Sequence, residues 1–449
     1  MPTPRRTRPR TEPPWHAGNR AGSILAWPAA SRLGGEIPAH GSAPPKLRFA
    51  CDNSYPCTSG ATIRQAAPAF TLPLLPTILQ DISVSALNTT VLWWTFLLSL
   101  CFGAVMHRTQ FCSMGSVADI VNFRDWTRMR MWALAIATAM LGTSLLAAFG
   151  LINTDQTIYT NNRVLWLSAL VGGVMFGFGM VLASGCGSKT LVRMGAGSLK
   201  ALVVFIMLAI GAYATLRGIT AEARVYGLDR MAVALAGPQD LPSILARHTQ
   251  VGRPVWLLVL GVGPALVLGA WSIWPREARS PRHLLGGIGI GGLVVALWWV
   301  SGHLGYLAES PLTLQHAYIG SVGNHMESFT FVAPLAYTLS WFLMYSDASN
   351  VLNIGIVSVF GVVAGAALHA LATRRFRWEG LAGLEDTANH LVGGLLMGIG
   401  GVTAMGCTIG QGITGVSTLS ITSWIALASI IAGGVLGVKY QAWRLDRSG

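Results

Sequence analysis

Charge is scarce in this 449-residue sequence, in which Asp, Glu, Lys and Arg together make up 11% of the residues, against about 25% in an average soluble domain. Hydrophobic residues make up 52%. The charged residues lie mostly outside long apolar runs, each close to the ~20 residues that a bilayer-spanning helix needs. These features exclude a soluble globular protein and predict a multi-pass protein of the lipid bilayer. The net charge of +13 is then attributed to loop Lys and Arg rather than to nucleic-acid binding.

Several signals of enzyme, metal or nucleotide chemistry are missing. The six cysteines form no CxxC pair and no even framework typical of a secreted disulfide domain. The ten histidines show no metal-ligand spacing, and the segment SGCGSKT has Ser188 where a phosphate-binding loop needs glycine before the lysine. No Asp or Glu falls in the middle of an apolar run, so a buried carboxylate relay for protons is not evident. The sequence therefore predicts no cofactor and no metal site.

The apolar runs begin only after a long N-terminal segment. Residues 1–80 are rich in Pro and Arg, contain Cys51 and Cys57, and lack an apolar stretch of helical length. We expect either a disordered tail or a start codon assigned too early, with a basic regulatory arm as the alternative. Spanning helices, about nine in all, are predicted at about 86–106, 130–152, 164–184, 199–217, 254–274, 283–301, 350–372, 388–405 and 421–440.

Four shorter stretches between these helices predict interrupted, re-entrant pieces. Three of them, 110–123, 185–197 and 406–418, are semi-apolar and led by Gly, Ser or Cys. The fourth, 328–345, carries Pro334 and is interpreted as re-entrant, with a tenth full span as the alternative. Such irregular backbone is tolerated at membrane depth only where protein or a water-filled cavity satisfies its polar groups.

The order of these pieces repeats along the chain. Residues 86–217 and 283–440 give the same series of helices and broken pieces, and helix 254–274 joins the two halves. Four helices plus one linker place the second half upside down relative to the first, as in many transporters. The sequence therefore predicts an all-α polytopic fold of two inverted repeats. Lys and Arg are concentrated in the loops on one side, which predicts a cytoplasmic C-terminus.

A cysteine among small residues leads each of the three semi-apolar pieces. A helix N-terminus attracts anions through its unpaired N–H groups, glycine allows close backbone approach, and a thiol adds a soft, weak donor. This combination favours an anion with terminal sulfur, or its selenium analogue, over sulfate. A lone buried cysteine usually serves packing, as expected for Cys101, but three equivalent ones favour a pathway. The predicted pathway residues are Cys112, Ser113, Gly185, Cys186, Gly187, Lys189, Gly406, Cys407, Thr408 and Gln411.

Two features near these cysteines leave alternatives open. The fourth piece offers Ser328 and Thr330 but no cysteine, which predicts an asymmetric pathway. Lys189 and Arg193 either hold an anion at the inner vestibule or simply mark the inner face.

Several long motifs resemble the YeeE/YedE family of sulfur-transport membrane proteins over residues 90–440: TQFCSMGSVADI, ASGCGSKTLVRMGAGSLKALVV, SFTFVAPLAYTL and MGCTIGQGITGVSTLS. The resemblance implies uptake of thiosulfate or a related sulfur anion through a bacterial inner membrane. It also implies that the anion passes between Cys112, Cys186 and Cys407 through S–H to sulfur hydrogen bonds. Some members of the family are associated with selenium metabolism. The resemblance also implies a cytoplasmic sulfur-carrier protein as a partner.

The competing class is a membrane thiol enzyme, either a sulfurtransferase or a quinone-linked oxidoreductase. Such an enzyme needs a cysteine of lowered pKa and a redox or base partner, and the sequence shows neither CxxC spacing nor a base beside the cysteines. A transporter rather than an enzyme is therefore predicted.

Overall fold

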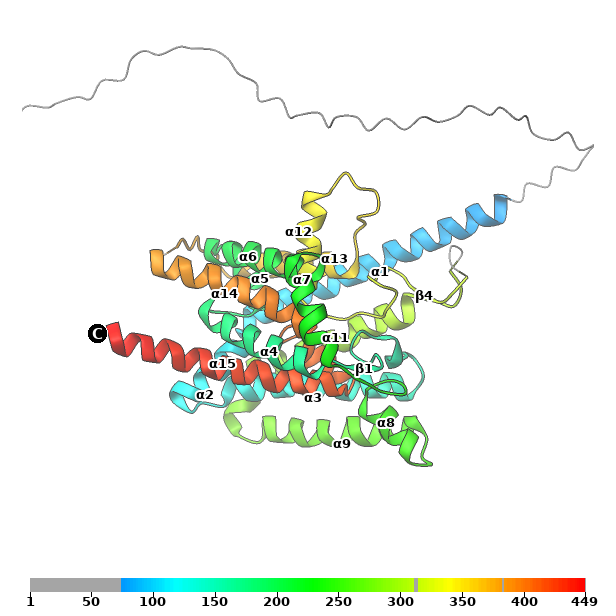
Figure 1. Cartoon of the computed structure of the whole chain (residues 1–449), viewed down its shortest axis with the longest axis horizontal. Helices are drawn as coiled ribbons and strands as arrows, with labels where there is room; N and C mark the ends of the chain where they lie inside the picture. The colour runs from blue at the N-terminus through cyan, green and yellow to red at the C-terminus, as the bar shows by residue number, and fades with distance from the viewer. Residues whose placement is uncertain (1–73, 311–313, 382, 449) are drawn as a thin grey trace, which may run out of the picture. The chain divides into compact units, whose positions relative to one another are not determined.

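The computed structural model describes residues 74–310, 314–381 and 383–448, so the predicted tail falls almost wholly outside the described residues. The described residues belong to one unit, Thr71–Gly449 (Figure 1). Its α-helices are α1 (Leu74–Thr109), α2 (Ser113–Phe123), α3 (Thr127–Ala148), α4 (Trp166–Leu182), α5 (Gly187–Gly195), α6 (Leu199–Arg217), α7 (Ile219–Ala223), α8 (Leu241–His248), α9 (Arg253–Ile273), α10 (Pro281–Leu284), α11 (Ile290–Trp299), α12 (Ala333–Leu343), α13 (Ile354–Ala372), α14 (Leu384–Thr403) and α15 (Ile421–Ser448).

The rest of the regular structure is short. The short 3-10 helices are η1 (Thr154–Gln156), η3 (Asp229–Met231) and η4 (Arg276–Arg279). The short π-helical segments are η2 (Arg224–Leu228), η5 (Leu285–Gly289), η6 (Val300–Leu304) and η7 (Gly410–Gly415). Two antiparallel pairs of two-residue strands also occur, β1 (Arg163–Val164) with β2 (Val233–Ala234) and β3 (Tyr306–Leu307) with β4 (Ala317–Tyr318). The predicted all-α class is confirmed.

Eight helical segments among the described residues are long and apolar enough to cross a membrane. Helix α14, at the predicted helix 388–405, has 20 residues but carries Glu385 and Asp386 in its first turn. Large apolar side chains such as Trp93 and Val267 remain exposed on the helices, as expected for surfaces that face lipid. The chain is a multi-pass membrane protein.

Helix α12 decides the nature of the fourth broken piece. It has 11 residues, about 16 Å at 1.5 Å per residue, and a bilayer core is about 30 Å thick. Pro334 lies in its first turn, where a missing N–H has no cost. Residues 325–331 before it form no helix or strand. The piece is therefore half-length, as the re-entrant interpretation expects, and is not a tenth span.

The long helices pack in pairs that the sequence repeat relates to one another. Helix α4 packs on α15 and α6 packs on α14, while α1 packs on α13 and α3 packs on α11. Glycines permit these close approaches, since a Cβ added at Gly103 of α1 would collide with the Val362 carbonyl of α13. Helix α9, at the predicted linker, packs on α3.

Candidate functional site

The backbone breaks in the same way before each of the three cysteines that the sequence predicts to form a pathway. Two residues before the cysteine, Gln110, Ser184 and Met405 adopt left-handed φ values of 56°, 56° and 59°. The next residue donates its N–H to the carbonyl five residues back, the bond that closes a helix in a Schellman motif. These bonds are Phe111 to Met106 (3.3 Å), Gly185 to Met180 (2.8 Å) and Gly406 to Gly401 (2.7 Å).

A new helical turn starts at each cysteine. Cys112 is the N-cap of α2 and its Sγ accepts the Gly115 N–H at 3.3 Å. Cys186 is the N-cap of α5, whose first residue is Gly187. The Sγ of Cys407 accepts the Gly410 N–H at 3.3 Å, at the start of η7. The thiols of Cys112 and Cys407 therefore accept backbone N–H groups that the helix start leaves unpaired, whereas Cys186 makes no such bond.

Cys186 occupies the middle of the three thiols. It is an electrostatic neighbour of both Cys112 and Cys407. The Ser113 hydroxyl donates to its Sγ at 3.5 Å, and the Ser188 hydroxyl lies 3.3 Å away. These neighbour relations order the thiols as Cys407, Cys186 and Cys112.

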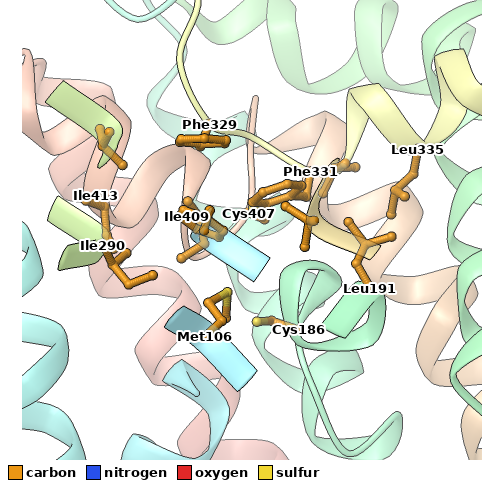
Figure 2. Close-up of a cluster of buried hydrophobic side chains, with 14 of the residues drawn as sticks. Met106, Cys186, Leu191, Ile290, Phe329, Phe331, Leu335, Cys407, Ile409 and Ile413 are labelled. Atoms are coloured by element: carbon orange, nitrogen blue, oxygen red, sulfur yellow. The ribbon is translucent and has the colours of Figure 1, made fainter. Parts of the chain in front are cut away.

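Packed side chains close this series of thiols to solvent. Cys186 and Cys407 are 1% and 0% exposed, whereas Cys112 is partly exposed. Figure 2 shows both buried thiols within one apolar cluster, with Met106 beside Cys186 and Phe331 beside Cys407. An anion that passes Cys186 and Cys407 must displace such side chains.

The surroundings of Cys407 include groups that the sequence did not single out. The N–H groups of Ile409 and Phe331 also face its Sγ. The buried Tyr159, from the loop after α3, bonds to the Thr330 side chain and is an electrostatic neighbour of Cys407. Thr330 was noted in the sequence, but no pattern in the segment around Tyr159 signals this contact.

Thr408 and Gln411 are completely buried beside Cys407. Gln411 Nε2 donates to the Ala404 carbonyl at 2.6 Å, and a Cβ added at Gly406 would lie 3.1 Å from the Gln411 side chain. Gln411 thus supports the backbone before the cysteine. The Thr408 hydroxyl has no hydrogen-bond partner among the described residues.

Lys189 and Arg193, equivalent in the sequence, differ in their surroundings. The Lys189 ammonium donates to Gln110 Oε1 at 3.1 Å and is an electrostatic neighbour of Cys112 and Cys186. Arg193 instead donates to the Ser184 carbonyl at 3.3 Å and lies 3.6 Å from the Glu379 carboxylate. Lys189 is thus the cation beside the thiols, whereas Arg193 is held by structural partners.

Beyond Lys189 lies a basic cavity, and we call this cavity the arginine end. Gln110 Nε2 donates to the His107 carbonyl at 2.7 Å, and the His107 and His369 Nδ1 atoms lie 2.8 Å apart. His369 lines a cavity of about 610 Å³. The cationic residues that share this lining are Arg108, Arg282 and Arg375. An anion that leaves Cys112 on this side meets a concentration of positive charge.

Comparison with known proteins identifies the group to which these motifs belong. The sequence model described as sulphur transport matches residues 108–436, which include all three cysteine breaks and α12. The chain belongs to the sulphur transport family. The resemblance to YeeE/YedE proteins is thereby confirmed, as is the prediction of a transporter rather than an enzyme.

Relatives within this family cover most of the chain. The chain is 30% identical over 365 residues to the thiosulfate transporter TsuA of Spirochaeta thermophila, with 80% of this chain and 100% of that protein covered. It is 27% identical over 354 residues to the thiosulfate transporter TsuA of Escherichia coli K12, with 76% and 91% covered. A 115-residue stretch is 29% identical to the probable transporter YedE of E. coli K12, with 24% and 26% covered.

The prediction that Cys101 serves packing is wrong, because its side chain is exposed. It is exposed on α1, while the next residue, Phe102, is completely buried. A helix turns 100° per residue, so the burial of Phe102 directs its neighbour outward. Cys101 is therefore apart from the three pathway thiols of this sulphur transport family member, and it provides a matched control for them.

Proposed function

We propose that the chain takes up thiosulfate, or a closely related sulfur anion, across the inner membrane of a bacterium. The observation that carries this proposal is the series Cys407, Cys186 and Cys112, each at the same kind of helix break. Two relatives that cover most of the chain bear the name thiosulfate transporter, which supports the same substrate.

The chemistry of the series suits an anion with both oxygen and terminal sulfur. Backbone N–H groups at the helix mouths suit the oxygens, because a helix N-terminus stabilises negative charge. The thiols suit the terminal sulfur, because they are soft, polarisable and weak donors. Cys186 is an electrostatic neighbour of both other thiols. It therefore receives the anion from one of them and passes it to the other.

The proposed direction runs from Cys407 to the arginine end. Lys and Arg favour the cytoplasmic side of a membrane protein, so the cavity with Arg108, Arg282 and Arg375 is assigned to the cytoplasm, with the C-terminus. Anion released there is available to a cytoplasmic sulfur-carrier protein, which we include as the proposed partner. The related helix pairs support two inverted repeats over 86–217 and 283–440 with 254–274 as linker.

The direct test is uptake of radiolabelled thiosulfate by proteoliposomes that contain the purified full chain. We expect saturable uptake that excess unlabelled thiosulfate abolishes and excess sulfate barely reduces, since sulfate lacks the terminal sulfur. Stronger competition by a selenium oxyanion than by thiosulfate would instead favour the selenium alternative. No uptake above empty liposomes would refute the proposal.

Topology is tested separately in cells. A reporter after Gly449 should be cytoplasmic and one inserted near Gly305 should be external. Finding both reporters on one side would contradict the inverted repeats.

A further inference from the structure

Glu327 has a half-buried side chain on the far side of Cys407 from the arginine end. Its Oε1 accepts the Val322 N–H at 2.7 Å, and its own carbonyl accepts the Ser301 hydroxyl at 2.5 Å. No Lys or Arg forms an ion pair with it within the described part of the chain. Its position is therefore fixed by the backbone, and its charge is not neutralised by a partner.

An outer cavity lies beside the backbone that holds this carboxyl. Val322, whose N–H holds the carboxyl, lines a cavity of about 310 Å³ together with Arg217 and Tyr337. The lining carries one charge of each sign, Arg217 and Asp347. Behind the carboxyl, Tyr159 is an electrostatic neighbour of both Glu327 and Cys407. Glu327 therefore lies between the cavity wall at Val322 and the surroundings of Cys407.

Few titratable groups face Glu327. They are Tyr159 from the loop after α3 and Tyr337 of α12, with Cys407 on the far side of Tyr159 and Arg217 on the far side of Tyr337. Burial of the carboxyl outweighs the Val322 hydrogen bond and raises the pKa of Glu327 to about 7. The group changes charge near neutral pH, where an ordinary glutamate is fully ionised.

We propose that the Glu327 carboxyl is a proton-binding site that couples anion uptake to proton uptake. The ionised carboxylate repels a dianion that approaches Cys407, and the protonated carboxyl lets it pass. One proton binds Glu327 from the outer side before each anion passes and is released toward the cytoplasm afterwards. This inference rests on the proposed function.

The test uses the full chain in proteoliposomes with internal pH held at 7.5 and external pH varied from 6 to 8. Thiosulfate remains a dianion over this range, so only the protein titrates. Wild-type uptake should fall by roughly tenfold as external pH rises, in proportion to the protonated fraction of a group with pKa near 7. Glu327→Gln keeps the neutral form and should show a flat profile, without stimulation by an inward proton gradient.

Glu309→Gln is the matched control, because Glu309 is an exposed acid in the same outer segment. It should retain the wild-type pH profile. A Glu327→Gln profile that falls like the wild type would overturn the proposal while leaving thiosulfate transport intact.

A second measurement needs only the wild type. A pH-sensitive dye trapped in the vesicles should report acidification when external thiosulfate is added, and no change with sulfate. Thiosulfate uptake without acidification would refute proton coupling even if the glutamine variant fails to fold. Absence of any thiosulfate uptake would refute the proposed function itself.

Discussion

The three cysteine breaks and the fourth broken piece place different groups in the interior. At the cysteine breaks a helix ends in a left-handed residue and a thiol opens the next helix. At the fourth, irregular backbone leads into α12 without a cysteine. There Thr414 donates to the Phe329 carbonyl at 2.7 Å and Ser328 donates to the Val294 carbonyl at 2.9 Å. The fourth piece therefore presents backbone groups to the interior, among them the Phe331 N–H, which faces Cys407.

This difference makes the two ends of the pathway chemically unlike. Cys112 has Lys189 and Arg128 as electrostatic neighbours. Cys407 has instead a buried phenol, Tyr159, with the Glu327 carboxyl beyond it. The thiol series thus has a cationic end and an acidic end, which supports the direction proposed for the pathway.

The largest expected effect comes from the thiols themselves. Cys186→Ser keeps the size and a hydroxyl donor but removes the soft sulfur contact in the middle of the series. A hydrogen bond to a charged partner contributes roughly 1.5–3 kcal/mol, or about ten- to hundredfold in an equilibrium. Thiosulfate uptake should fall at least tenfold, with the amount of protein in the membrane unchanged. The same is expected of Cys112→Ser and Cys407→Ser.

Cys101→Ser is the control for these variants, because its thiol is exposed on α1 and remote from the series. It should transport like the wild type. Wild-type uptake in all three pathway variants would assign these cysteines to packing and leave only helix N-termini to bind the anion.

A smaller loss is expected when the cation beside the thiols is removed. Lys189→Gln keeps a donor toward Gln110 but removes the charge next to Cys112 and Cys186, so uptake should fall by several-fold to about tenfold. Arg193→Gln is the matched change on the same helix, and should reduce uptake less per folded molecule, since its partners are Ser184 and Glu379. Initial rates normalised to membrane abundance measure both. Equal losses would mean that Lys189 has no special relation to the thiols.

The hydrophobic runs allowed the positions of the long helices to be predicted from the sequence. Lipid demands about 20 apolar residues for each helix, so all nine predicted positions carry a helix, and Pro334 marked the short α12. Helix ends were less well predicted, since capping decides them locally. Helix α13 begins at Ile354 rather than near 350 because the Asn353 side chain accepts the Ile356 N–H at 3.0 Å.

The site was only partly readable. The cysteines were visible because each carries its own local pattern of small residues and helix restart. Tyr159 and Glu327 were not, since their relation to Cys407 depends on contacts between segments far apart in the chain. The sequence placed Glu327 outside every span, and only the folded loops half-bury it and bring it near Tyr159. Likewise, Lys189 and Arg193 look alike until Glu379 is brought beside one of them.

The smallest expected effect concerns the left-handed residue that the three cysteine breaks share. Ser184 is exposed and has φ 56°, a conformation that costs L-residues roughly 1–2 kcal/mol and glycine almost nothing. Ser184→Gly should therefore raise the Tm of the detergent-purified protein by a few degrees, roughly 2–4 °C per kcal/mol. Ser184→Val should lower it, because a β-branched side chain fits this region poorly, and Ser184→Ala should leave it unchanged. Uptake per folded molecule should stay the same in the glycine and alanine variants. A lower Tm for the glycine variant would show that Ser184 contributes something besides its backbone conformation, and that the cysteine breaks are less alike than their geometry indicates.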